Sequence, residues 1–133
     1  MTMWFVPRDA AARSMGSDEV AEALIAQGHD VIRTGSRGML WLEPLVECAR
    51  EPGGPRVGWA NVDPADVAEA GLQETAANYL GVVADMDYLV KQDRWVFERA
   101  GVIDPLDPDD YVANGGLAGL RAALALPPGD VIS

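Results

Sequence analysis

The chain has 133 residues, of which 49% are hydrophobic, and its 21 acidic and 10 basic residues give a formal net charge of −11. This length is sufficient for one domain with a hydrophobic core. Because so negative a chain repels phosphate groups, and because Lys and Arg form no cluster, we exclude nucleic acids and anionic membranes as partners. The chain has no run of about 20 apolar residues that could span a membrane. It also lacks the basic N-terminal region of a signal peptide, so we expect a cytoplasmic protein.

The chain has one cysteine, Cys48, and one histidine, His29. A single thiol excludes an intrachain disulfide and a metal site built from several Cys and His ligands. A Ser-His-Asp triad would depend wholly on His29. That residue follows a predicted helix and precedes a predicted strand, where a surface or capping role is commoner than catalysis.

The first part of the chain predicts a strand, a helix and a second strand. Residues 3–6 form a short apolar run that is typical of a buried strand. We expect Ser17 to cap a helix with apolar residues at helical spacing and Gly28 to end that helix. Residues 30–34 predict the second strand, and the glycine-containing segment 35–38 predicts a turn.

The next part predicts an antiparallel hairpin and another helix. Residues 42–48 and 56–61 are the two expected strands, joined by the proline- and glycine-rich turn 51–55. Pro64 is expected at the first position of a helix. The order is therefore β-α-β-β-β-α over residues 1–71, which predicts an α/β domain.

The pattern of apolar and turn residues becomes less regular over residues 72–133. Residues 85–92 predict a helical turn or two, and residues 94–97 predict an extended segment. Apolar residues recur at helical spacing over residues 117–124, which predicts an amphipathic helix. We expect residues 1–71 to form the cooperative core and residues 72–133 to be more mobile.

Four aspartates and two prolines lie between Asp104 and Asp110. A calcium loop would need the EF-hand spacing, its glycine and its closing glutamate, and these are absent. We therefore expect a loop that leads into a helix, with Asp109 or Asp110 as its N-cap.

The residues themselves indicate no catalytic centre. The segment 35–38 matches neither the Walker pattern nor GxGxxG, so a structural turn is the better interpretation. No pair of carboxylates stands out among 21 acidic residues. Arg37, Met39 and Trp41 are of the residue types enriched at interface cores, and we expect them to bind a partner. The alternative is that Met39 and Trp41 pack into the core of the chain itself.

Two sets of residues resemble known families. The second half contains the stretches Gln92-Asp-Arg94, Gly101–Pro105, Asp110-Tyr111, Gly115-Gly116 and Leu120–Leu124. These stretches resemble the segment that leads into the flavin domain of the complex I NADH-binding flavoproteins. The first half contains the stretches Val6–Asp9, Gly35–Met39 and Trp41–Val46. These resemble the beta subunit of soluble, molybdenum-dependent, NAD-reducing formate dehydrogenases.

The resemblance implies a parent subunit that passes electrons from formate oxidation through FMN to NAD. In that family a glycine-rich run holds the flavin, and later cysteines bind a 4Fe-4S cluster. Neither feature is present in this chain, so we expect it to have no catalytic, cofactor-binding or metal-binding residue. FMN, NAD and the 4Fe-4S cluster would belong to the parent subunit. Residues 72–133 would be a linker and helical segment that precedes its FMN/NADH domain.

Residues 1–71 also resemble the thioredoxin-like 2Fe-2S ferredoxin domains of partner subunits. By alignment, the four cysteine positions of those domains correspond to Pro7, Ala12, Ser36 and Leu40. None of these residues is a thiolate ligand. The resemblance therefore implies a degenerate thioredoxin-like fold that has lost the cluster.

We expect the chain to be a structural and docking portion of the diaphorase subunit of an NAD-dependent formate dehydrogenase. Its partners would be the thioredoxin-like 2Fe-2S gamma subunit and the molybdenum-bearing alpha subunit. Two alternatives are a free-standing adaptor or assembly protein built on the same domain, and an unrelated small enzyme that uses the acidic loop.

Overall fold

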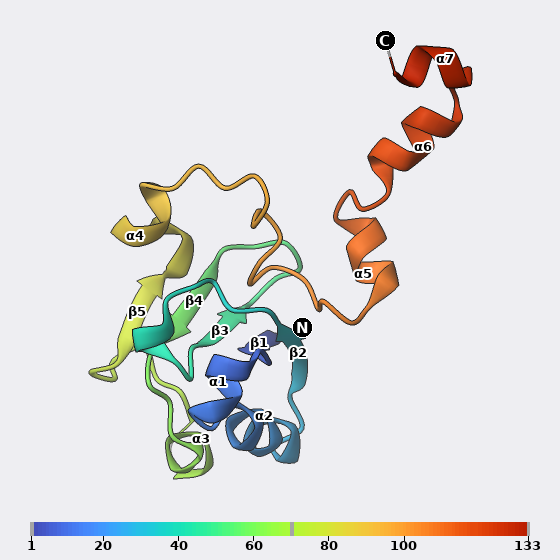
Figure 1. Cartoon of the computed structure of the whole chain (residues 1–133). Helices are drawn as coiled ribbons and strands as arrows, with labels where there is room; N and C mark the ends of the chain where they lie inside the picture. The colour runs from blue at the N-terminus through green and yellow to red at the C-terminus, as the bar shows by residue number, and fades with distance from the viewer. Residues whose placement is uncertain (1, 70, 133) are drawn as a thin grey trace.

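A five-stranded mixed sheet organises the chain, in the order β2-β1-β3-β4-β5 (Figure 1). The structure is a computed structural model that describes residues 2–69 and 71–132. The strands are β1 (Met3–Pro7), β2 (Asp30–Thr34), β3 (Val46–Ala49), β4 (Arg56–Trp59) and β5 (Tyr79–Val82). β1 pairs in parallel with β2, and every other neighbouring pair is antiparallel. The predicted α/β fold is confirmed.

The crossover between β1 and β2 contains two helices, α1 (Ala10–Ser14) and α2 (Ser17–Ala26). No sequence pattern predicted α1, which Asp9 caps by accepting hydrogen bonds from two backbone N–H groups. The prediction that Ser17 caps α2 is wrong. The N-cap is Gly16, at a φ of +96°, and Ser17 is buried in the first turn. Only Met15 separates the end of α1 from Gly16, so the chain enters α2 through a left-handed conformation, which glycine adopts without strain.

The hairpin of β3 and β4 is present, but its first strand is shorter than predicted. The expected strand 42–48 begins only at Val46, because residues 40–42 form a 3₁₀ turn, η1 (Leu40–Leu42). The next helix, α3 (Pro64–Glu69), begins at Pro64 as predicted.

Side chains alternate between the two faces of the sheet, and each face has its own core. Helices α1 to α3 lie on the first face (Figure 1). The buried core there is lined by Trp4, Val6, Val20, Ala21, Leu24, Val46, Cys48, Trp59, Val62 and Val67. The residues between them in the strands, such as Phe5, Glu47 and Arg56, therefore belong to the second face.

The second face is covered by the chain that follows β5. This chain contains η2 (Val83–Asp85) and α4 (Asp87–Val90), then residues 91–104, which we call the strap. The second core is formed by Met39, Leu42, Leu45, Ala60 and Val83. The domain was predicted to end at position 71. Residues beyond that position supply one strand of the sheet and the segment that covers its second face.

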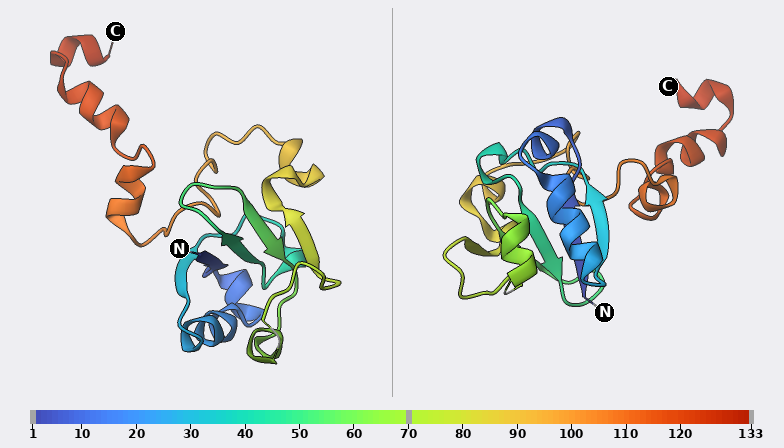
Figure 2. Two further views of the ribbon diagram at one scale, coloured as in Figure 1. Left: turned by 180° about the vertical axis from the view of Figure 1, so that it is seen from behind. Right: turned by 90° about the horizontal axis from the view of Figure 1, so that it is seen from below.

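Residues 105–132 form an arm that projects away from the sheet (Figures 1 and 2). The arm contains α5 (Pro108–Ala113), α6 (Ala118–Leu124) and α7 (Pro128–Val131). The N-cap of α5 is Asp107, which accepts hydrogen bonds from the N–H groups of Asp109 and Asp110. The prediction that Asp109 or Asp110 caps the helix is therefore wrong, because Pro108 occupies its first turn. Within the described ranges, no helix is long and apolar enough to cross a membrane.

Candidate functional site

The three residues predicted to bind a partner lie in the loop between β2 and β3 but face different ways. Met39 is 1% exposed and belongs to the second core. The Arg37 side chain is 13% exposed and is paired with Glu47. Trp41 is 59% exposed and packs edge-on against Tyr88, with ring centroids 5.0 Å apart. The three residues therefore do not form one surface, and only Trp41 presents a large exposed side chain.

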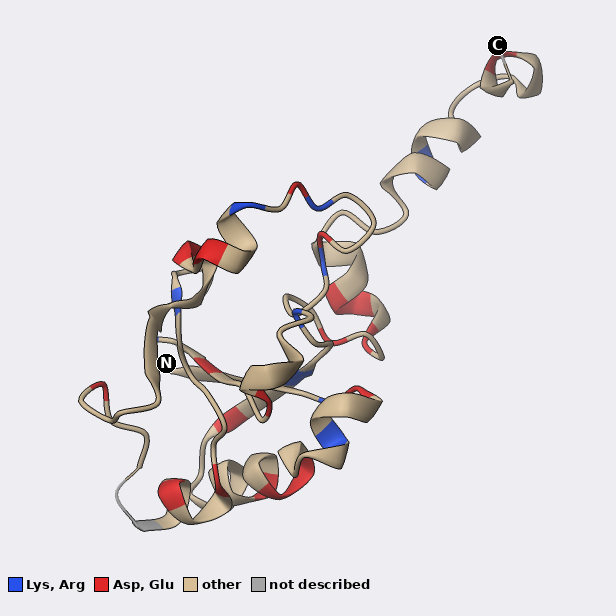
Figure 3. Ribbon diagram, turned by 60° about the vertical axis from the view of Figure 1, so that its left-hand side comes forward, with Lys and Arg blue, Asp and Glu red and all other residues tan. Residues whose placement is uncertain are grey.

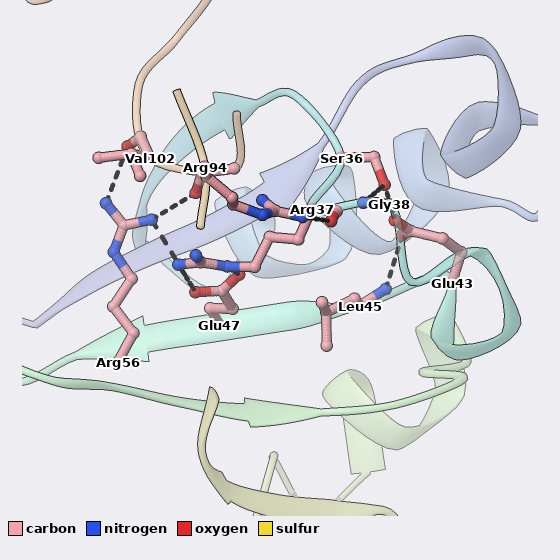
Figure 4. A network of polar contacts seen from close by, with 10 residues as sticks. Ser36, Arg37, Gly38, Glu43, Leu45, Glu47, Arg56, Arg94 and Val102 are labelled. Atoms are coloured by element: carbon pink, nitrogen blue, oxygen red, sulfur yellow. Dashed lines mark hydrogen bonds and ion pairs between the residues drawn. The ribbon is translucent and has the colours of Figure 1, made fainter. Parts of the chain in front are cut away.

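Glu47 is the centre of a buried ionic network on the second face of the sheet (Figure 4). Its side chain is 3% exposed. Arg37 binds it with two hydrogen bonds, Nε to Oε1 at 2.5 Å and Nη2 to Oε2 at 2.8 Å. Arg56 adds an ion pair at 3.9 Å. A buried carboxylate is stable only when it is paired and hydrogen-bonded, and two guanidinium groups satisfy this carboxylate.

The same arginines fasten the strap to the sheet. Arg56 donates hydrogen bonds of 2.8 Å to the carbonyl oxygens of Gly101 and Val102. Its guanidinium also lies over the ring of Phe5, 3.4 Å from the centroid. Burial lowers the pKa of Arg56, and the charge of Glu47 opposes that shift. At the other end of the strap, Arg94 donates to the carbonyl oxygen of Arg37.

A second buried carboxylate, Glu43, holds the same loop from its other side. Glu43 is 1% exposed. Its carboxylate accepts hydrogen bonds from the Ser36 hydroxyl at 3.0 Å and from the Leu45 N–H at 2.9 Å. Burial raises the pKa of Glu43, and the nearby charge of Asp9 adds to the effect. Ser36 in turn accepts a hydrogen bond from the N–H of Gly38, so the loop is braced internally.

The donor set does not fit the 2Fe-2S cluster of the ferredoxin domains that the sequence resembles. Pro7 and Ala12 are buried, Ser36 is engaged with Glu43, and Leu40 is exposed. None of the four side chains supplies a thiolate. The cysteine of this chain, Cys48, lies instead in β3 in the first core, and burial raises the pKa of its thiol. Among the described residues, no group of three or more His, Cys, Asp or Glu side chains is arranged to hold a metal ion.

An exposed aromatic patch lies beside this network. We define it as Trp95, Val96 and Phe97, which follow Arg94 in the strap and lie side by side at the surface. The three strap residues of the patch are 68–91% exposed. Trp41 and Tyr88 form a separate exposed pair, from η1 and α4. Large exposed apolar side chains that gather in one place mark interaction sites in soluble proteins.

Glu43, Glu47 and Arg56 were not predicted as site residues from the sequence. One signal could have identified Glu47, because it lies in β3 between residues that are all buried. A charged residue inside an apolar strand usually has a partner of opposite charge. No sequence signal identified Arg56 as that partner, since the pairing of β3 with β4 brings it near.

Comparisons with known proteins give a remote structural similarity. No family model matches the sequence, and no curated protein matches it. A thioredoxin-like [2Fe-2S] ferredoxin from Aquifex aeolicus is similar at 21% identity and a TM-score of 0.43, over 52% of this chain and 74% of the ferredoxin. A second structure, of the wild-type ferredoxin from the same organism, is similar at 24% identity and a TM-score of 0.41, over 52% of this chain and 80% of that one. This likeness concerns the fold and carries no cluster, activity or partner to this chain.

Proposed function

We propose that this chain is a docking portion, without a catalytic centre of its own, of an electron-transferring dehydrogenase complex. More specifically, we propose the N-terminal part of the diaphorase subunit of a cytoplasmic NAD-dependent formate dehydrogenase. The residues quoted above support this assignment by their resemblance to that subunit. FMN, NAD and the 4Fe-4S cluster are proposed for the parent subunit and not for these residues.

The observation that carries the docking role is the aromatic patch on a fastened strap. Trp95 is 81% exposed, and the strap is tied to the rest of the chain on both sides of it, by the Arg94 side chain directly before it and by Arg56 at Gly101 and Val102. A large aromatic side chain on a fixed backbone loses little conformational entropy on binding, so it suits an interface anchor. The buried network therefore has a role that catalysis does not require, which is to hold the patch in place.

We propose that the patch binds the thioredoxin-like 2Fe-2S subunit or the molybdenum-bearing subunit of the same complex. The test is a titration of the purified chain with each of these two subunits from its own organism. We expect saturable binding of one of them. The double variant Trp95→Ser/Phe97→Ser should weaken this binding at least tenfold, which is about 1.4 kcal/mol.

The matched control is Leu120→Ser/Leu124→Ser, which removes two exposed apolar side chains from the arm instead. This control should bind the same subunit as tightly as the unmodified chain does. If the unmodified chain binds neither subunit, the proposed function is wrong. If both double variants weaken binding equally, the patch is not the docking surface.

A further inference from the structure

The outer part of the arm, residues 117–132, carries large apolar side chains that the described part of the chain leaves exposed. Six of them are 43–88% exposed: Leu117, Leu120, Leu124, Leu126, Val131 and Ile132. The remaining residues of α6 are Ala and Gly, apart from Arg121. A helix that is apolar over most of its circumference is normally packed against another surface.

Charge is almost absent from this outer arm. It contains one basic residue, Arg121, and one acidic residue, Asp130, so its net charge is zero (Figure 3). The whole chain has a formal net charge of −11. Neither residue forms an ion pair with any other described residue. The outer arm is thus an apolar surface of zero net charge. It carries one positive and one negative side chain, and neither is paired with another described residue.

The position of the arm favours contact between two copies of the chain. The acidic domains of two copies repel each other, but the arm projects away from the sheet (Figures 1 and 2). Two arms can therefore meet while the sheets remain apart, and salt screens charges that are separated by more than about 8 Å at physiological ionic strength. The outer arm is where a second copy meets the least repulsion.

We propose that two copies of the chain bind each other through α6 and α7, with the arms antiparallel. Leu120 and Leu124 lie in the contact, and Arg121 of each copy pairs with Asp130 of the other. An antiparallel arrangement has two-fold symmetry, so this ion pair forms twice. Ala123, three residues after Leu120 and so on the same side of α6, is small enough to let the two helices approach closely. This surface is separate from the aromatic patch, so the two binding events are independent.

The contact is small by the standards of stable interfaces, so we expect a weak, reversible dimer. Sedimentation velocity over two decades of protein concentration measures its dissociation constant. Leu124→Ser should raise the dissociation constant at least tenfold.

A charge exchange tests the antiparallel register. Arg121→Asp and Asp130→Arg should each weaken the dimer severalfold, and the double variant should restore it. Trp95→Ser/Phe97→Ser removes the aromatic patch and should leave the dimer unchanged, so this control separates the inference from the proposed function. A chain that stays monomeric throughout, a charge exchange that fails to restore the dimer, or a dimer lost with the patch instead of with Leu124 would each overturn the inference.

Discussion

Replacing Glu47 by glutamine should be among the most destabilising conservative changes in this chain. Glu47 is 3% exposed and accepts two hydrogen bonds from Arg37, with Arg56 at 3.9 Å. The variant leaves two buried guanidinium groups without a counter-charge. Breaking a buried ion pair in this way costs about 3–5 kcal/mol. Because the amide oxygen of glutamine still accepts one hydrogen bond, we expect a loss of about 3 kcal/mol, the lower end of that range.

Urea unfolding followed by tryptophan fluorescence measures this loss, since Trp4 and Trp59 lie in the first core. The matched control is Asp87→Asn. This change also turns a carboxylate into an amide, but in an exposed pair with Lys91. It should cost no more than about 0.5 kcal/mol.

A double-mutant cycle isolates the pair itself. Arg37→Met and Glu47→Gln made together should cost less than the sum of the single changes, by about 1–3 kcal/mol. If Glu47→Gln costs no more than Asp87→Asn, this network does not fasten the strap. Additive single changes would likewise show that the two side chains do not depend on each other.

Three further predictions concern Glu43, Gly101 and the arm. Burial raises the pKa of Glu43 above its ordinary value of 4.5, so its contribution to stability is present below that pH and is lost as the pH rises through the folded-state pKa. Glu43→Gln should therefore gain stability relative to the unmodified chain as the pH rises from acid to neutral in urea unfolding, and a pH-independent difference would contradict this. Gly101→Ala should cost about 2–4 kcal/mol, because its φ is +79° and a Cβ would collide with Arg37 Cγ. Gly53→Ala, at a φ of +73° with no atom within 4 Å, should cost only about 1–2 kcal/mol in the same assay, and equal losses would exclude the close contact as the cause. Amide hydrogen exchange of the monomer should be slow in the central strands and fast over residues 117–132, whereas protection of both would contradict the contact-poor arm.

Local sequence patterns determined most of the first half of the fold. Apolar runs, helical spacing and the turn at residues 51–55 located β1, α2, β2 and the hairpin, because these features depend on residues close in sequence. Tertiary contacts decided the extent of the sheet. β5 (Tyr79–Val82) is short and lies next to turn residues, so no sequence pattern marked it as a strand. Its strand conformation depends on pairing with β4.

The candidate site divides in the same way. Its residue types were visible in the sequence, and Trp41 and Trp95 proved to be exposed. The orientation of Arg37 was not visible, because its carboxylate partner Glu47 lies ten positions away in β3, beyond the loop that contains Arg37. The path of this loop over the sheet brings the two charges together, and a buried charge turns toward its partner because burial without one is costly. The sequence by itself therefore determined which charged and aromatic residues the loop and strap contain, and the packing of the strap on the sheet decided which of them are buried in ion pairs and which remain exposed.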